Sequence, residues 1–276
     1  MQTNETLSTH LLSLQEGTIA YDDTNTSGPL VICVPGVGDL RASYRFLVPS
    51  LVAAGYRVVT MDLRGHGESS VGWSDYLDTT SARDVLALVH SLNAGPALLI
   101  GNSYGGSAVT YAAAIDPNAV AGLVLLDAYV RDLPLTLLQR LALWAVAQIG
   151  ASAWTLYYKS LYVSKQPSDM PIYLATLKAN LKERGRFAAT KAMLYGSHAT
   201  VETHLADVKA PTLIMMGSKD PDFPDAANEA KYTAEHLRGA SRTEIHLIEG
   251  AGHYPHAEMP EHVSPLVVAF LQQIKE

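Results

Sequence analysis

Short runs of apolar, often β-branched residues alternate along the chain with longer stretches whose apolar positions recur at helical spacing. Nearly continuous apolar runs are typical of strands that are covered on both faces, as in a parallel sheet. Such strands are predicted at residues 29–34, 57–62, 97–102, 121–127, 211–217 and 243–249. Helices are predicted between them, at residues 43–54, 80–93, 104–115, 226–237 and 261–274. This alternation predicts an α/β fold with a doubly wound sheet, preceded by a hairpin at residues 11–22.

The alternation stops between about residues 130 and 204, where helical patterns follow one another without a convincing strand. Ligands bind outside the carboxyl ends of parallel strands, so a helical insertion there would cover the ligand crevice. We therefore expect a helical cap at residues 130–204 and a core domain formed by residues 1–129 and 205–276. The stretch 141–158 carries no charge. It is predicted to form a buried or substrate-facing helix pair rather than a membrane span, with the aromatic residues of the cap mostly in its core.

Composition and charge narrow the class of partner. The chain has 276 residues, 48 % of them hydrophobic, and a formal net charge of -7. No block of Lys and Arg could line a nucleic-acid groove, so a small-molecule substrate is expected. The single cysteine, Cys33, lies in an apolar run and is predicted to be a buried core thiol. The N-terminal residues lack the pattern of a secretory signal. A cytoplasmic monomer or homodimer is therefore expected, with weak contact with a lipid surface left open.

The stretch at residues 101–105 reads Gly-Asn-Ser-Tyr-Gly, between a predicted strand and a predicted helix of small residues. In this context Gly-x-Ser-x-Gly predicts a sharp turn that exposes the hydroxyl of Ser103 at its tip. Glycine is expected at Gly101 and Gly105 because the neighbouring backbones come close. The following helix directs its free N–H groups toward any oxyanion that forms there. Ser103 is therefore the predicted nucleophile, with an N-cap serine as the structural alternative.

A serine hydroxyl is a weak nucleophile at neutral pH, so it needs a base, and the base needs a group that orients it. Candidates for both roles follow predicted strands, in the chain order serine, acid, histidine. Asp220 follows the strand at 211–217, and His253 follows the strand at 243–249. The predicted catalytic triad is Ser103, Asp220 and His253. An unperturbed imidazole has a pKa of about 6.5. The base must be neutral to accept a proton, so enzyme activity is expected to fall as the pH drops below that value.

With these motifs the chain resembles the α/β-hydrolases of the capped esterase, lipase and epoxide-hydrolase branch. The resemblance covers nearly the whole chain, including the loop at residues 62–69, Asp-Leu-Arg-Gly-His-Gly-Glu-Ser. It implies an α/β-hydrolase fold with an eight-stranded, mostly parallel sheet flanked by helices and a cap inserted after the sixth strand. The acid loop, Gly-x-x-Asp-x-x-x-Pro, matches residues 217–224, and Gly-x-Gly-His matches residues 250–253.

The resemblance also implies an oxyanion hole formed by the backbone N–H groups of Val37 and Tyr104. Val37 follows the glycine of a turn that reads Pro-Gly-Val-Gly, in which the family's usual histidine is replaced by Pro35. Because the donor is a backbone group, the hole should form, but the bracing of the turn is left open. Removing one donor of an oxyanion hole typically costs about 3 kcal/mol.

Several residues compete for these roles. The rival acids are Asp222 and Asp225, which could instead cap the next helix, and Asp127, at the end of the sixth predicted strand. His256 and Glu258 have metal-like spacing but match a family loop that holds no metal, and His66 is expected to stabilise its own loop. His198 and His204 are expected to be structural or solvated. Nothing in the sequence indicates a metal or organic cofactor.

The serine at the turn excludes reactions of this fold that need a carboxylate nucleophile, such as haloalkane dehalogenation. Serine, histidine and an oxyanion hole together serve acyl transfer, so a carboxylic ester hydrolase acting on small to medium apolar acyl esters is predicted. One alternative is a carbon-carbon bond hydrolase of the meta-cleavage-product type, for which Arg184 or Arg186 could bind a substrate carboxylate. Tyr254, however, stands where those enzymes usually have Trp. A ligand receptor that retains the site is the other alternative, and lactone, thioester, amide and perhydrolysis chemistry also stay open.

Overall fold

Eight strands form one sheet in the computed structural model, which describes residues 9–134 and 136–274. They are β1 (Thr9–Ser13), β2 (Thr18–Asp23), β3 (Leu30–Val34), β4 (Arg57–Met61), β5 (Ala97–Asn102), β6 (Val120–Leu126), β7 (Thr212–Gly217) and β8 (Thr243–Ile248). Their order is β1-β2-β4-β3-β5-β6-β7-β8. β2 pairs antiparallel with β1 and β4, and the remaining neighbours pair in parallel. The predicted mostly parallel sheet is confirmed, as are the six strands and the hairpin.

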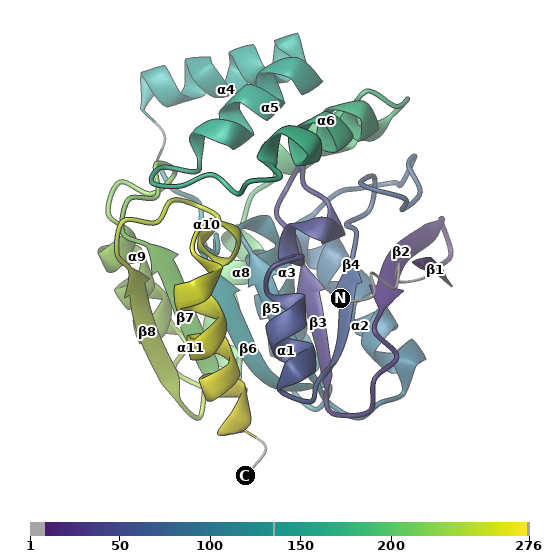
Figure 1. The fold of residues 1–276 in the computed structure, drawn as a ribbon, viewed down its shortest axis with the longest axis vertical. Coiled ribbons are helices and arrows are strands. Elements are labelled where there is room, and N and C mark those ends of the chain that lie inside the picture. The colour runs from purple at the N-terminus through teal and green to yellow at the C-terminus, as the bar shows by residue number, and fades with distance from the viewer. Residues whose placement is uncertain (1–8, 135, 275–276) are drawn as a thin grey trace.

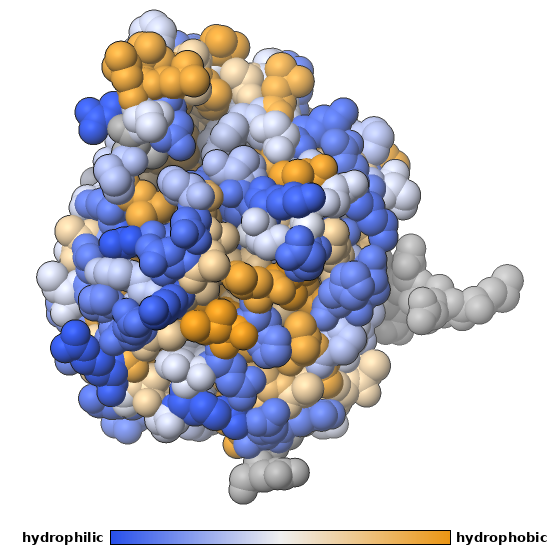
Figure 2. All heavy atoms as spheres, turned by 90° about the vertical axis from the view of Figure 1, so that its left-hand side faces the viewer, coloured by the Kyte–Doolittle hydropathy of each residue, from blue (hydrophilic) through white to orange (hydrophobic). Residues whose placement is uncertain are grey.

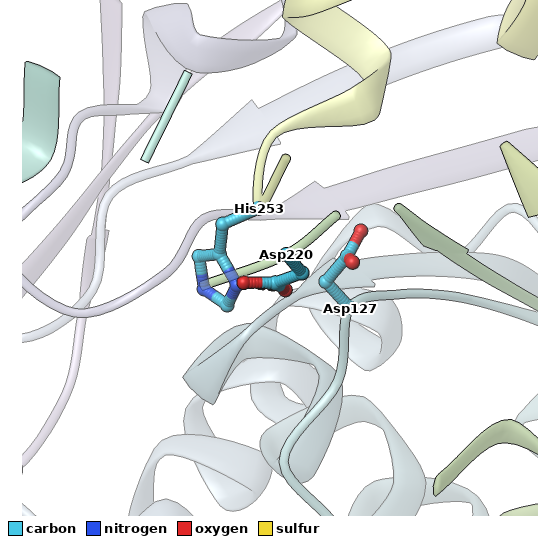
Figure 3. A group of neighbouring side chains, drawn as sticks. All are labelled: Asp127, Asp220 and His253. Atoms are coloured by element: carbon cyan, nitrogen blue, oxygen red, sulfur yellow. Dashed lines mark hydrogen bonds and ion pairs between the residues drawn. The ribbon is translucent and has the colours of Figure 1, made fainter. Parts of the chain in front are cut away.

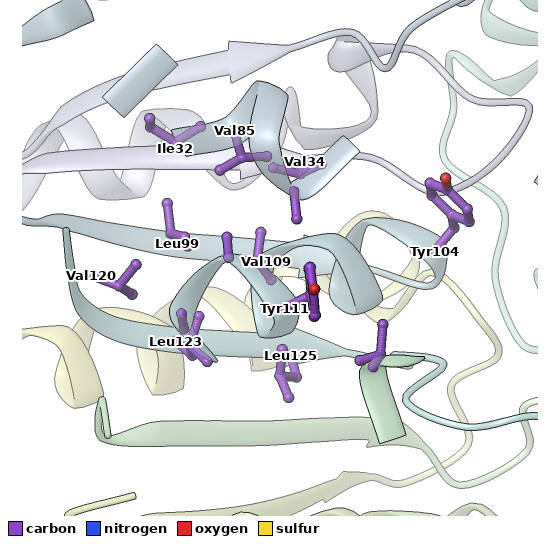
Figure 4. Close-up of a cluster of buried hydrophobic side chains, with 14 of the residues drawn as sticks. Ile32, Val34, Val85, Leu99, Tyr104, Val109, Tyr111, Val120, Leu123 and Leu125 are labelled. Atoms are coloured by element: carbon purple, nitrogen blue, oxygen red, sulfur yellow. The ribbon is translucent and has the colours of Figure 1, made fainter. Parts of the chain in front are cut away.

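Helices cover both faces of the sheet, because successive side chains of a buried strand point to opposite faces. On β5, Leu99 packs into one core together with residues of α2 (Asp78–Leu92) and α3 (Tyr104–Ile115), part of which Figure 4 shows. Leu98 and Ile100 pack into the other core, with α1 (Val48–Ala53) and α11 (Pro260–Gln272). Figure 1 shows α1 and α11 in front of the sheet. Cys33 is fully buried in this second core.

The helices flanking the sheet differ from the predicted ranges in two places. Instead of one helix at 43–54, the chain forms a 3-10 turn, Arg41–Tyr44, and then α1. Pro49 lies in the first turn of α1, where its missing N–H needs no partner, so the proline sets the start of this helix. Near the C-terminus the short α10 (Pro255–Glu258) precedes α11. The helix α9 (Ala226–His236) matches its predicted range to within one residue.

Between β6 and β7 the described residues form five α-helices and a 3-10 turn, Leu205–Asp207. The α-helices are α4 (Leu137–Ile149), α5 (Ala151–Ser160), α6 (Met170–Leu181), α7 (Arg186–Leu194) and α8 (Ala199–Thr203). No strand is assigned between β6 and β7 in the described part of the chain. Figure 1 shows α4, α5 and α6 lying over one end of the sheet. Trp154, Tyr158 and Tyr173 of these helices form a third apolar core with Tyr254, which belongs to the segment after β8. These helices are therefore packed by aromatic side chains onto the segment that follows β8.

The uncharged stretch at 141–158 is divided at Gly150, whose φ of 91° ends α4 and begins α5. α5 buries Trp154 and Tyr158, as expected of a buried helix. α4 differs, because one of its faces is exposed: Leu138 is 77 % exposed and Trp144 58 %. Figure 2 shows apolar residues gathered at the top of the molecule, where Figure 1 places α4. Within the described ranges, no helix is long and apolar enough to span a membrane.

Candidate active site

The turn between β5 and α3 places Ser103 at its tip in a rare backbone conformation, with φ 54° and ψ -123°. The glycines around it are required by lack of space. A Cβ on Gly101 would lie 2.4 Å from the carbonyl oxygen of Gly105. A Cβ on Gly105 would lie 2.2 Å from the carbonyl oxygen of Val34, at the end of β3. Because both obstacles are backbone atoms, no side-chain movement can relieve these contacts. The sharp, crowded turn read from the sequence is present, and the strained φ of Ser103 is typical of functional turns.

His253 and Asp220 form a buried hydrogen-bonded pair, shown in Figure 3. The His253 Nδ1 lies 2.6 Å from Asp220 Oδ2, and both residues are at most 4 % exposed. The backbone of His253 is held from two sides. Its N–H donates to the carbonyl of Leu161, and its carbonyl accepts from the side-chain amide of Asn102, at 3.1 Å. Since Asn102 precedes Ser103, this bond ties the histidine loop to the serine turn.

Ser103 and His253 line the same pocket, which has a volume of about 530 Å³. The pocket lies between the carboxyl ends of the strands and the inserted helices, since α4 and α5 contribute Ala142, Leu143 and Tyr157 to its lining. In this structure the hydroxyl of Ser103 makes no hydrogen bond with any described residue. Hydrogen bonds between catalytic residues are often long before substrate binds, so Ser103 and His253 can still act together. Nδ1 is bonded to Asp220, so Nε2 is the ring atom left for the serine or a substrate.

Two opposing effects act on the pKa of His253. Burial alone would lower it, but the carboxylates of Asp220, Asp222 and Asp39 together outweigh burial and raise the pKa to about 9. The unperturbed value of about 6.5 therefore does not apply to this site. The imidazole is held as a cation over a wider pH range than the sequence alone suggests.

The turn at residues 35–38 carries Val37, which lines the pocket together with Tyr104. It is held by two side chains from distant segments. The N–H of Gly38 donates to His66 Nε2 at 3.0 Å, and the indole N–H of Trp154 donates to the Gly38 carbonyl at 2.8 Å. Burial lowers the pKa of His66 to about 4, so its ring is neutral and able to accept this bond.

These two hydrogen bonds brace the turn, although Pro35 replaces the family's usual histidine. His66 also contacts its own loop, through the carbonyl of Arg64. Its bond to Gly38 was not foreseen. The only signal in the sequence was that the turn at 35–38 lacks its usual histidine and that another one lies in the polar loop at 62–69.

The rival acids occupy three different environments. Asp225 caps α9, because its side chain accepts from the N–H of Asn228. Asp127 is fully buried beside Asp220 at the end of β6, as Figure 3 shows, and its Oδ1 accepts from the N–H of Gly217 at 2.7 Å. Burial first, and the nearby charge of Asp220 second, raise the pKa of Asp127 well above its ordinary range. Asp222 lies on the pocket side of His253.

The remaining histidines lie apart from the pair formed by His253 and Asp220. His256 is buried against the ring of Tyr44, and burial lowers its pKa to about 3. The Glu258 carboxylate accepts backbone N–H groups, among them that of Gly252. His198 lines the pocket and bonds to Asp78, whereas His204 bonds to a backbone carbonyl within its own helical turn.

Three residues come close enough together to hold a metal ion by distance alone. Ligand atoms of Asp127, Asp220 and His253 all lie within 4.8 Å of one another. The Asp220–His253 hydrogen bond and the Asp127–Gly217 hydrogen bond already use oxygens of both carboxylates. Hydrogen bonding therefore explains why these three side chains lie close together, without a metal ion.

Comparison with known proteins agrees with this architecture. The model of the alpha/beta hydrolase family matches residues 31–263. The AB hydrolase superfamily protein YisY of Bacillus subtilis is 25% identical over 289 residues, which cover 95% of this chain and 98% of that protein. A bromoperoxidase from Bacillus anthracis superposes with a TM-score of 0.81 at 22% identity, covering 96% of this chain and 100% of the other. A thermophilic esterase from Thermogutta terrifontis superposes with a TM-score of 0.76 at 24% identity, covering 97% and 99%. These two structures share the fold.

Proposed function

Because the chain belongs to the alpha/beta hydrolase family, we propose that it is a serine hydrolase that cleaves carboxylic esters with small to medium apolar acyl groups. One observation carries the proposal: Ser103, at the strained turn, lines one pocket with His253, whose Nδ1 is 2.6 Å from Asp220. Residues 130–204 would act as the cap, and residues 1–129 and 205–276 as the core. The apolar residues of the pocket, such as Leu143 of α4, support an apolar acyl group.

In the proposed reaction Ser103 Oγ attacks the ester carbonyl while its proton passes to His253 Nε2. The negative charge that develops on the carbonyl oxygen is stabilised by the N–H groups of Val37 and Tyr104. His253 then gives the proton to the leaving alcohol, and Asp220 keeps the imidazole oriented and stabilises its charge. Water attacks the acyl enzyme by the same route in reverse. Every proton transfer uses these side chains, so the proposed reaction requires no metal or organic cofactor.

The carbon-carbon hydrolase alternative needs a cation for the substrate carboxylate, and the pocket does not favour it. Among the described residues that line the pocket there is no Lys or Arg, whereas Asp132 and Asp222 bring negative charge. Arg186 instead pairs with Glu183 and donates to a backbone carbonyl. The electrostatics therefore favour a neutral ester over an anionic diketone acid.

The test is labelling with a fluorophosphonate, read by mass spectrometry, together with turnover of a p-nitrophenyl ester series. Wild type should carry the label on Ser103 and turn over many times, and Ser103→Ala should lose both label and turnover. Ser160→Ala is the matched control, because Ser160 also lies beside the pocket but outside the turn. Folded wild type that takes no label and turns over no ester would refute the proposal and favour a ligand receptor with the same site.

A further inference from the structure

Asp222 has no role in the proposed triad, yet its carboxylate lies within the site. The two oxygens of this side chain have different surroundings. Oδ1 accepts a hydrogen bond from the hydroxyl of Tyr157 on α5. Oδ2 lies 3.8 Å from His253 Nε2, and the side chain, 16 % exposed, lines the pocket. One carboxylate oxygen is thus fastened to the inserted helices while the other is open toward the reacting groups.

The position of Oδ2 places it near the alcohol part of the substrate and away from the acyl group. Nε2 is the atom that gives a proton to the leaving alcohol, whose ester oxygen must then come within about 3 Å of it. Because Oδ2 is 3.8 Å from the same atom, the leaving oxygen and Oδ2 are separated by at most roughly 7 Å. A hydroxyl two carbons away from the ester oxygen spans such a gap. The acyl group, in contrast, is attached on the far side of the carbonyl carbon from the leaving oxygen.

Asp222 Oδ2 faces the imidazole of His253, whose Nε2 is 3.8 Å away and too far for a hydrogen bond, so the oxygen keeps room for a donor from a ligand. The other pocket-lining carboxylate, Asp132, already accepts from Ser197 Oγ and from the N–H of His198. No Lys or Arg of the described residues lines the pocket, so the positive charge that faces Asp222 is that of His253 when its imidazole is protonated. A partly buried carboxylate oxygen is stabilised by a donor, and it is penalised when a ligand covers it without supplying one.

Resting on the proposed ester hydrolysis, we propose that Asp222 is a specificity-determining residue that selects esters whose alcohol carries a second hydroxyl close to the ester oxygen. The hydroxyl donates to Asp222 Oδ2 while Nε2 serves the leaving oxygen. Tyr157 acts as a positioning residue, because its hydroxyl holds Oδ1 and so directs Oδ2 into the pocket.

The experiment compares three butyrate esters that share one acyl group: 2-hydroxyethyl, 2-methoxyethyl and choline. Since all three form the same acyl enzyme, differences in kcat/KM report only steps up to acylation. The methoxy ester keeps the oxygen and removes the donor, and choline offers a cation without a donor. We expect 2-hydroxyethyl butyrate to be preferred over the methoxy ester by about tenfold in wild type, the usual effect of a hydrogen bond to a charged group.

The variants locate the origin of the preference. Asp222→Asn should reduce the hydroxyl-to-methoxy ratio to within about twofold, and Tyr157→Phe should reduce it less because the carboxyl group of Asp222 stays. Asp225→Asn, three residues further along and exposed, should keep the wild-type ratio. The ratio within each protein is the readout, so a general loss of rate does not affect it. Fluorophosphonate labelling confirms that each variant is folded, and the wild-type ratio tests the proposal even if Asp222→Asn fails to fold.

The outcomes separate this inference from the function on which it rests. Equal kcat/KM for the hydroxy and methoxy esters in labelled wild type would overturn the role of Asp222 and leave the hydrolase intact. The same holds for a ratio that survives Asp222→Asn. Preference for choline above the other two would overturn the donor requirement and indicate a cation site. Hydrolysis of all three by Ser103→Ala at the wild-type rate would instead overturn the proposed function.

Discussion

Replacing Asp127 with asparagine should stabilise the protein relative to wild type, and increasingly so as the pH rises from 5. Asp127 is fully buried, and burial and the charge of Asp220 raise its pKa well above the ordinary value. The folded protein therefore keeps a proton on this carboxyl group when the unfolded chain has released it. Asparagine has the same shape and can still accept the Gly217 N–H. It also tolerates the left-handed backbone at this position, where φ is 45°.

The size of the effect follows from proton linkage. Above the unfolded pKa of about 3.9, the native state of wild type holds one proton more than the unfolded state. Its free energy of unfolding then falls by about 1.4 kcal/mol for each pH unit, until the pH reaches the folded pKa of Asp127. Stability from this group is thus complete at low pH and is lost as the pH rises. Asparagine does not titrate, so the variant lacks this loss.

Urea unfolding of both proteins at half-unit steps between pH 5 and pH 8 measures this difference. The free energy of unfolding of Asp127→Asn minus that of wild type should rise with a slope of about 1.4 kcal/mol per pH unit and then flatten near the folded pKa. Asp127→Leu is the contrasting variant, because it leaves the Gly217 N–H buried without an acceptor, at a cost of about 1–3 kcal/mol. A difference that does not change with pH would show that Asp127 is ionised in the folded protein and refute the reasoning.

Three further results are expected. With the pKa of His253 raised to about 9, kcat/KM for a neutral ester should fall about tenfold per pH unit below that value, because the base must be neutral; a constant kcat/KM from pH 7 to 9 would contradict this. Gly105→Ala should destabilise the fold by about 1–3 kcal/mol in urea and abolish fluorophosphonate labelling, since its Cβ would meet the Val34 carbonyl at 2.2 Å; retained labelling would count against the crowded turn. Cys33, whose thiol pKa is raised by burial, should react with Ellman's reagent only after unfolding; rapid reaction in native protein would argue against its burial.

Much of the fold could be predicted from local sequence pattern. A strand buried on both faces needs a continuous apolar run, and such a run is visible without knowing its neighbours, as at β5 and β7. The turn at Ser103 could also be predicted from local sequence, because its glycines are required by the backbone geometry that the five-residue motif specifies. The prediction was less accurate at α1, where a helix was expected from residue 43. The helix begins only at Val48, with Pro49 in its first turn.

Several features of the candidate site depend on contacts that no local pattern contains. His66 reaches Gly38 across 28 positions, and Tyr157 reaches Asp222 across 65. Asp127 and Asp220 come together only because β6 and β7 are neighbours in the sheet. The sequence by itself determined most of the strands and helices, and it determined the candidate serine, acid and histidine with their order along the chain, because these follow from residue type and periodicity. The tertiary structure alone decided which carboxylate is buried, which faces the pocket and how far the histidine pKa moves, because burial and charge proximity are properties of packed neighbours.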